Sequence, residues 1–203
     1  KDKKTITFNE AEIIGDEIDK IYISKVKELS LNPDVIKRQH DLKIIYTPIH
    51  GTGVKLVPMA LAEYGFTNIM NVPEQDVISG DFPTVVSPNP EESAALSLAL
   101  DKARKTDAEL IIATDPDADR LGIAVKNHNS EYTLLNGNQT AVLLTYYLLS
   151  QWSANGKIKG KEFIVKTIVT TDLITLIADK FKVEHFNVLT GFKFIADIIR
   201  KNE

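Results

Sequence analysis

Residues 110–120 read LIIATDPDADR, an apolar run that leads directly into three aspartates at alternate positions. The run Leu110–Thr114 is predicted to be a buried strand, because a short continuous apolar segment next to turn residues suits a parallel sheet. Ligand sites of such sheets lie outside the carboxyl ends of the strands. Asp115, Asp117 and Asp119 therefore stand where a site is expected.

The three carboxylates indicate a metal site. In an extended loop, alternate side chains can be directed to one point, and three such charges repel one another without a cation. Oxygen ligands alone favour a hard ion, Mg²⁺ or Ca²⁺. A calcium EF-hand fits poorly, because it needs Gly and Glu where this chain has Arg120 and Lys126. A solvated acidic turn without an ion is the structural alternative.

Strand and helix patterns alternate along the rest of the chain. Strands are predicted over residues 42–46, 69–72, 110–114, 121–126, 132–135, 163–169 and 183–189. Helices are predicted over residues 9–30, 54–64, 91–105, 139–151, 170–180 and 192–201. The alternation predicts an α/β protein of two consecutive α/β/α domains, with mainly parallel mixed sheets covered by helices. The domains are expected to span residues 1–135 and 136–203, the second incomplete at its C-terminal end.

Three residues mark predicted helix ends. Asn9, with Glu12 three residues later, forms a capping-box pattern for the first helix. Gly65 is placed for a C-terminal cap, and Pro90 for the first turn of the helix over 91–105.

The composition excludes several functional classes. The net charge of −4 over 203 residues argues against nucleic-acid binding. The chain has no cysteine, so a thiolate zinc site is impossible. No apolar run reaches the roughly 18 residues that span a bilayer, and no signal peptide is evident. A cytoplasmic location is expected, and the chain, which does not begin with Met, is expected to come from a longer one.

A strand ending in D-x-D is also similar to the haloacid-dehalogenase phosphatases and mutases. In that interpretation Asp115 is the phosphate-carrying nucleophile and Asp117 the general acid and base. Lys166 could supply the required lysine, but no acidic pair follows downstream. This alternative and a non-catalytic metal-binding module both stay open.

Six segments together resemble a more specific family, the α-D-phosphohexomutases, which include phosphoglucomutases and phosphomannomutases. The resemblance covers almost the whole chain and keeps the family's order. The segments are DPDADR (115–120), YTPIHGTG (46–53), PNPE (88–91), LNGNQ (135–139), VKTIVTT (165–171) and TGFKFI (190–195).

The resemblance implies that the chain is the middle part of a four-domain mutase, covering domain two and most of domain three. Such an enzyme moves a phosphoryl group between C1 and C6 of a hexose phosphate. The substrates are glucose or mannose 1- or 6-phosphate, and a 1,6-bisphosphate is the intermediate. A phosphoserine gives the phosphoryl group, and Mg²⁺ is held by Asp115, Asp117, Asp119 and the phosphoserine.

The resemblance also implies roles for cationic and turn residues. Arg120 is expected to be catalytic, as a fork that matches phosphate oxygens. Lys166 is expected to face the sugar phosphate or to shuttle a proton; otherwise it reaches solvent from a strand end. Lys193, with Thr190 and Gly191, is expected to bind substrate at a helix N-terminus. Otherwise Lys193 is a solvated lysine in the first turn of the helix, and Thr190 and Gly191 only form the helix entry.

Parts of the family pattern are missing. A phosphoserine segment such as TASHNP and the GEES-type sugar loop do not occur in the sequence. The chain alone is therefore expected to be inactive. His50, a lone histidine in a Gly-rich turn, is more consistent with a structural role. Gly51 and Gly53 do not open a dinucleotide loop, because the G-x-G-x-x-G pattern fails at Leu56.

Overall fold

The computed structural model describes residues 14–202, so the predicted cap at Asn9 and Glu12 lies outside the described residues. The first part of the chain contains α1 (Gly15–Lys27), α2 (Pro33–Arg38), β1 (Ile44–Thr47), α3 (Gly53–Tyr64), β2 (Ile69–Asn71), α4 (Ser97–Thr106), β3 (Leu110–Thr114), β4 (Leu121–Lys126) and β5 (Tyr132–Leu135). The second part contains α5 (Gly137–Ala154), β6 (Phe163–Thr167), α6 (Leu173–Phe181), β7 (Glu184–Val188) and α7 (Phe192–Asn202). Within residues 14–202, no helix has the length and apolar character to cross a membrane.

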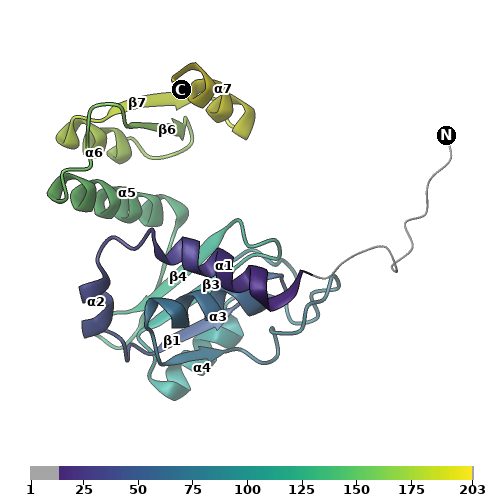
Figure 1. The fold of residues 1–203 in the computed structure, drawn as a ribbon. Helices are drawn as coiled ribbons and strands as arrows, with labels where there is room; N and C mark the ends of the chain where they lie inside the picture. Colours follow the sequence, from purple (N-terminus) through teal and green to yellow (C-terminus); the bar gives the residue numbers. More distant parts are fainter. Residues whose placement is uncertain (1–13, 203) are drawn as a thin grey trace.

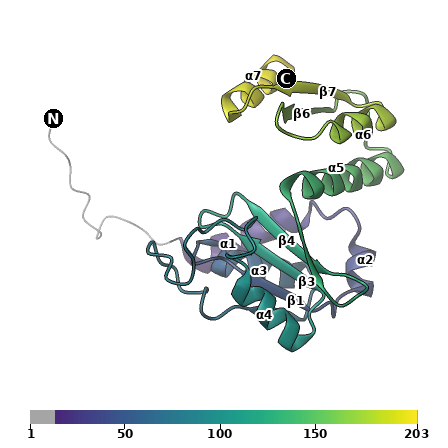
Figure 2. The same ribbon diagram turned by 180° about the vertical axis from the view of Figure 1, so that it is seen from behind.

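The first part is built on a five-stranded sheet with the strand order β2-β1-β3-β4-β5. β1 runs parallel to β2 and β3, whereas β4 is antiparallel to β3 and β5. α1 and α3 cover one face of this sheet and α4 covers the other (Figures 1 and 2). The predicted α/β class with mixed, mainly parallel sheets is confirmed.

The two central strands are apolar on both faces because helices cover both sides. All four residues of β1 are buried, and a core cluster joins Ile45 of β1 and Ile111 of β3 to Ala99 and Ala103 of α4. Each fully buried isoleucine side chain contributes about 1.5–3 kcal/mol. This packing fixes the position at which each central strand ends.

The second part has a two-stranded parallel sheet, in which Phe163 of β6 lies opposite Glu184 of β7. Its core joins Leu149 of α5, Ile177 of α6 and Val183. α5 begins with a capping box, because Asn136 and Gln139 each accept the backbone N–H of the other at 2.9 Å. One residue therefore separates the end of β5 from the start of α5.

The prediction of a helix over residues 91–105 is wrong at its start, because α4 begins only at Ser97. Residues 91–96 form successive turns, with Ala95 N–H donating to Glu92 O at 3.0 Å. Two tertiary contacts hold this conformation. The Pro90 carbonyl lies tightly against the backbone of Gly122, and the Gln75 amide donates to Ala95 O at 3.3 Å. Pro90 thus does not open the helix.

Other ends differ less from the prediction. Gly65 caps α3 in the left-handed conformation, with φ of 116°, as predicted. β6 ends at Thr167, two residues early, because Thr170 N–H donates to Thr167 O at 2.9 Å and turns the chain. α6 consequently begins at Leu173 and not at residue 170.

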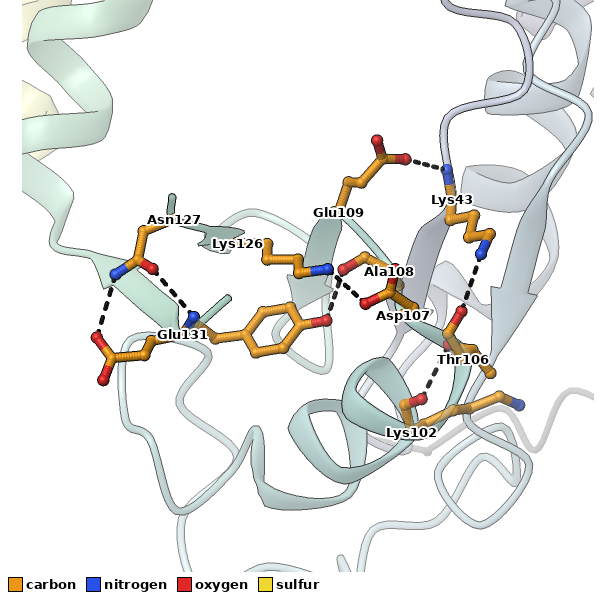
Figure 3. Close-up of polar contacts among 10 residues, drawn as sticks. Lys43, Lys102, Thr106, Asp107, Ala108, Glu109, Lys126, Asn127 and Glu131 are labelled. Carbon is orange, nitrogen blue, oxygen red and sulfur yellow. Dashed lines mark hydrogen bonds and ion pairs between the residues drawn. The ribbon is translucent and has the colours of Figure 1, made fainter. Parts of the chain in front are cut away.

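Polar contacts join the strands at the amino end of β3, the edge opposite to the three aspartates (Figure 3). Lys43 N–H donates to Glu109 Oε2 at 3.1 Å, and its Nζ donates to Thr106 O at 3.2 Å. Lys126, at the end of β4, forms an ion pair with Asp107. These contacts join β1, β3 and β4 at the amino end of β3. The loops at its carboxyl end take no part in them and are free to form a site.

The contact between Gly122 and Pro90 gives a stability prediction. A Cβ on Gly122 would overlap the Pro90 carbonyl, whereas a Cβ on Gly80 would meet no atom within 4 Å. Gly122→Ala is expected to lower the free energy of unfolding by about 1–3 kcal/mol, as overpacking does. Gly80→Ala is the matched control and should change it little. Urea denaturation measures both, and equal stabilities of the two variants would contradict the assigned contact.

Candidate metal centre

The candidate site lies at the carboxyl ends of β1 and β3, which are neighbours in the sheet. Their register pairs Thr47 with Ala113, so both strands end at nearly the same height. The turn over residues 48–53 and the loop over residues 115–120 therefore leave the sheet side by side. Thr52 N–H donates to Pro116 O at 2.8 Å and joins the two segments.

The three predicted metal ligands come together. One carboxylate oxygen each from Asp115, Asp117 and Asp119 lies within 4.8 Å of the others. Among the residues that the structure describes, this is the one such cluster of potential metal ligands. Asp115 is buried, and Asp117 and Asp119 are exposed, so the cluster opens to solvent on one side.

The loop conformation differs from the predicted extended one. Ala118 N–H donates to Asp115 O at 3.0 Å, and Ala118 has φ of 61°, in the left-handed region. A tight turn thus brings the alternate aspartates together, because an extended loop would not close the distance between the first and the last. A left-handed alanine is strained, and the hydrogen bonds of the loop hold it.

Arg120 fixes the buried carboxylate. Its backbone N–H donates to Asp115 Oδ1 at 2.9 Å, and its Nε donates to Asp115 Oδ2 at 2.9 Å. Burial acts to raise the pKa of the Asp115 carboxyl, but these two hydrogen bonds and the charge of Arg120 outweigh it, so the pKa is lowered. The Asp115 carboxylate is therefore held in place by Arg120, and its charged form is favoured.

The two exposed carboxylates, those of Asp117 and Asp119, repel each other. The neighbouring charge of Asp117 raises the pKa of the Asp119 carboxyl, with smaller contributions from desolvation and from Asp115. Arg120 Nε lies 4.0 Å from Asp119 and offsets this repulsion only in part. Three carboxylates and one guanidinium leave a local excess of negative charge, which suits a divalent cation.

Lys166, a predicted catalytic residue, lies in the second part of the chain. It is buried on β6, and its Nζ donates to Thr170 O and to Asp172 Oδ1, both at 2.9 Å. The Asp172 side chain is 90% exposed. The alternative of a lysine that simply reaches solvent is wrong, because only 5% of the Lys166 side chain is exposed.

Thr190 and Gly191 precede α7, and Lys193 lies in its first turn. Gly191 has φ of 126°, a conformation that favours glycine. Lys193 Nζ lies 4.9 Å from the centre of the Phe194 ring. No hydrogen bond or ion pair within residues 14–202 joins Lys166 or Lys193 to the aspartate loop. The structure thus brings together the aspartates and Arg120, and these two lysines lie apart from them.

His50 has the structural role that its sequence context suggested. Its side chain is buried, with Nδ1 2.8 Å from Val77 O and Nε2 2.8 Å from Thr84 Oγ1. Sequence reasoning missed Thr52, whose Oγ1 donates to Pro116 O at 3.1 Å. The sequence did carry one signal for this contact. If β1 and β3 are neighbouring parallel strands, the loops after them must lie side by side.

Two family models match this chain, one in each of the two parts described above. Residues 20–129 match the family model of phosphoglucomutase/phosphomannomutase alpha/beta/alpha domain II, and residues 136–203 match that of domain III. A phosphoglucomutase from Staphylococcus saprophyticus is 38% identical over 190 residues, which are 94% of this chain and 33% of that protein. A probable phosphomannomutase from Haemophilus influenzae is 35% identical over 187 residues, 92% of this chain and 36% of that protein.

Solved structures show the same fold. A phosphoglucomutase/phosphomannomutase family protein from Burkholderia thailandensis aligns with a TM-score of 0.69 at 19% identity, covering 91% of this chain and 36% of that chain. A putative phosphomannomutase from Thermus thermophilus aligns with a TM-score of 0.67 at 20% identity, covering 91% and 39%. The chain spans about a third of the length of the curated relatives above. It belongs to the phosphoglucomutase/phosphomannomutase family, of which it carries domains II and III.

Proposed function

We propose that this chain supplies the Mg²⁺ site and part of the sugar-phosphate site of a hexose-phosphate mutase. The reaction is transfer of a phosphoryl group between C1 and C6 of glucose or mannose phosphate, through a phosphoserine that this sequence does not contain. One observation carries the proposal: Asp115, Asp117 and Asp119 converge at the carboxyl end of β3 in a chain of this family. The matched relatives are named phosphoglucomutase and phosphomannomutase.

The donor set fits Mg²⁺. It consists of carboxylate oxygens, and it contains no nitrogen or sulfur atom, as expected for a hard cation. Bound there, Mg²⁺ would neutralise charge on the transferring phosphoryl group and orient its oxygens. Asp115 would be the fixed ligand, because Arg120 already holds both of its oxygens. Asp117 and Asp119, which face solvent, leave the open side to a phosphate.

Arg120 would act on two groups. Its Nε donates to Asp115, yet 55% of its side chain remains exposed. The exposed part of the guanidinium offers further N–H donors in the fork geometry that phosphate oxygens accept. In this role Arg120 orients a metal ligand and also binds the phosphoryl group.

The second part of the chain would bind the sugar phosphate. The Lys166 side chain is buried, and its carboxylate partner Asp172 is almost fully exposed, so a phosphate would take the place of the Asp172 carboxylate beside the Lys166 Nζ. Lys193 follows Gly191 in the first turn of α7, where backbone N–H groups favour an anion. Thr190 and Gly191 would shape this entry.

An aspartyl-phosphate mechanism is less consistent with the geometry. A nucleophilic carboxylate oxygen must contact the phosphorus atom of the substrate directly, but only 3% of the Asp115 side chain is exposed. Beryllofluoride with Mg²⁺ separates the two mechanisms, because it would modify Asp115 only if this residue were the nucleophile.

Metal binding gives the first test of the proposal. Mn²⁺ is a suitable probe, since its binding can be followed by electron paramagnetic resonance. We expect the chain to bind Mn²⁺ more weakly than micromolar, because the phosphoserine ligand is absent. Loss of outer-shell partners alone costs about 10–100-fold in metal affinity, so Asp117→Asn and Asp119→Asn should each cost at least about tenfold.

The matched control is Asp101→Asn, which removes an exposed aspartate of α4 that pairs with Arg104. Its Mn²⁺ affinity should equal that of the wild-type chain. An unchanged affinity in Asp117→Asn and Asp119→Asn would contradict the proposed ligands.

Removal of one ligand should stabilise the metal-free fold. The pKa of Asp119 is raised by the charge of Asp117, so the charged form of Asp119 disfavours the folded state at pH values above its folded pKa. Asp119→Asn removes this repulsion, and its melting temperature at pH 7 with a chelator should exceed that of the wild type. The difference should decrease as the pH falls through the folded pKa and disappear below the pKa of Asp119 in the unfolded chain. A lower melting temperature at pH 7 would argue against repulsion.

Mutase activity gives a further test. The 203-residue chain should not convert glucose 1-phosphate to glucose 6-phosphate, because no segment of its sequence matches the phosphoserine segment. A coupled assay with glucose-6-phosphate dehydrogenase measures this, with a full-length phosphoglucomutase as the positive control. Turnover by the purified chain would show that the phosphoryl carrier lies within these residues.

A further inference from the structure

The turn over residues 48–53 lies against the aspartate loop, although it contributes none of the three carboxylates. Pro116 O accepts two hydrogen bonds from Thr52, one from the backbone N–H at 2.8 Å and one from Oγ1 at 3.1 Å. A Cβ on Gly51 would overlap Pro116 Cα and lie 2.6 Å from Pro116 O. The two backbones are therefore in direct contact next to Asp115 and Asp117.

The turn has a strained conformation. Ile49 and His50 have φ of 46° and 62°, in the left-handed region. Isoleucine rarely adopts this region because its side chain branches at Cβ. Strain of this kind costs about 1–3 kcal/mol for each residue, and it persists only where the surroundings fix the conformation.

A buried hydrogen-bond network provides this constraint. Ile49 N–H donates to Thr47 Oγ1 at 3.2 Å, and the Thr47 hydroxyl donates to Gln75 Oε1 at 2.6 Å. The Gln75 amide donates to Thr84 Oγ1 at 3.1 Å, and Thr84 Oγ1 lies 2.8 Å from His50 Nε2. The His50 backbone N–H donates to Gln75 O at 2.9 Å. Both ends of the strained pair are thus fixed to the same segment.

We propose that Thr52 is a positioning residue, which holds the aspartate loop in the conformation that binds the metal. The network fixes the turn, the turn presents the two donors of Thr52, and these fix the carbonyl between Asp115 and Asp117. The inference rests on the proposed metal site. Thr52 contacts no carboxylate of the cluster in this arrangement, and it acts only through the backbone of Pro116.

The test compares two variants of Thr52 in the 203-residue chain. Thr52→Val removes the hydroxyl and keeps the shape, whereas Thr52→Ser keeps the hydroxyl. One hydrogen bond contributes about 0.5–1.5 kcal/mol, which corresponds to about a two- to tenfold loss of Mn²⁺ affinity in Thr52→Val. Thr52→Ser should bind Mn²⁺ as the wild type does. Ala103→Gly, in the interior of α4, is a destabilised control whose affinity should not change.

A second measurement needs no metal. The amides of Ala118 and Arg120 donate to Asp115 within the loop, so their hydrogen exchange reports local opening of the loop. In the metal-free chain, Thr52→Val should accelerate the exchange of these two amides and leave the amides of β3 unchanged. Thr52→Ser should restore slow exchange. Unchanged exchange in Thr52→Val would overturn the positioning role, whether or not the chain binds a metal.

The outcomes separate the positioning role from the proposed function. If the wild type binds Mn²⁺ through Asp117 and Thr52→Val binds it equally well, the positioning role is wrong and the metal site stands. If Thr52→Val loosens the loop but the wild type binds no Mn²⁺, Thr52 positions the loop and the metal function is wrong. Gly51→Ala forces the two backbones apart. If this variant folds, its amide exchange in the loop should be accelerated more than that of Thr52→Val.

Discussion

The parallel pairing of β1 with β3 is the constraint on which the site depends. Four residue pairs, from Ile44 with Leu110 to Thr47 with Ala113, fix the two strands in register. Both strands are covered by helices on each face (Figures 1 and 2), so a shift in register would disturb the core on both sides. Because the two strands end together, the loop with the aspartates always emerges beside the turn that contains Thr52. Without this pairing, Thr52 would not lie against Pro116.

Local patterns predicted the strands and the longer helices. The short helix α2 was not predicted, although Asn32 caps it and Pro33 opens it, and tertiary contacts account for several of the other differences. The strand before Asp115 and the hairpin of β4 and β5 follow from short apolar runs with turn residues between them. The start of α4 could not be read from residues 91–96, because their composition favours a helix while the contact of Pro90 with Gly122 prevents it. The left-handed conformation of Ala118 could not be predicted either, because glycine or asparagine is the usual sequence signal for that conformation. The ion pair of Lys166 with Asp172 could not be predicted, because the turn between the two residues has no regular pattern of apolar residues.

The electrostatic design of the aspartate loop divides the three carboxylates into two kinds. Asp115 is buried and compensated, because Arg120 donates to both of its oxygens. Asp117 and Asp119 remain exposed and repel each other. The buried member resembles a structural ion pair, and the exposed members resemble a binding surface. The loop conformation is held by hydrogen bonds within the chain, from the amides of Ala118 and Arg120 to Asp115.

The capping box at Asn136 affects how the two parts of the chain can move. β5 ends at Leu135 and α5 starts at Gly137, so the connection is a single residue whose side chain and backbone N–H are both hydrogen-bonded. Hinges in proteins absorb motion through changes of φ and ψ in a few residues. The connection between β5 and α5 contains only Asn136, which is already hydrogen-bonded. A rotation of α5 relative to β5 would therefore have to break one or both of these hydrogen bonds.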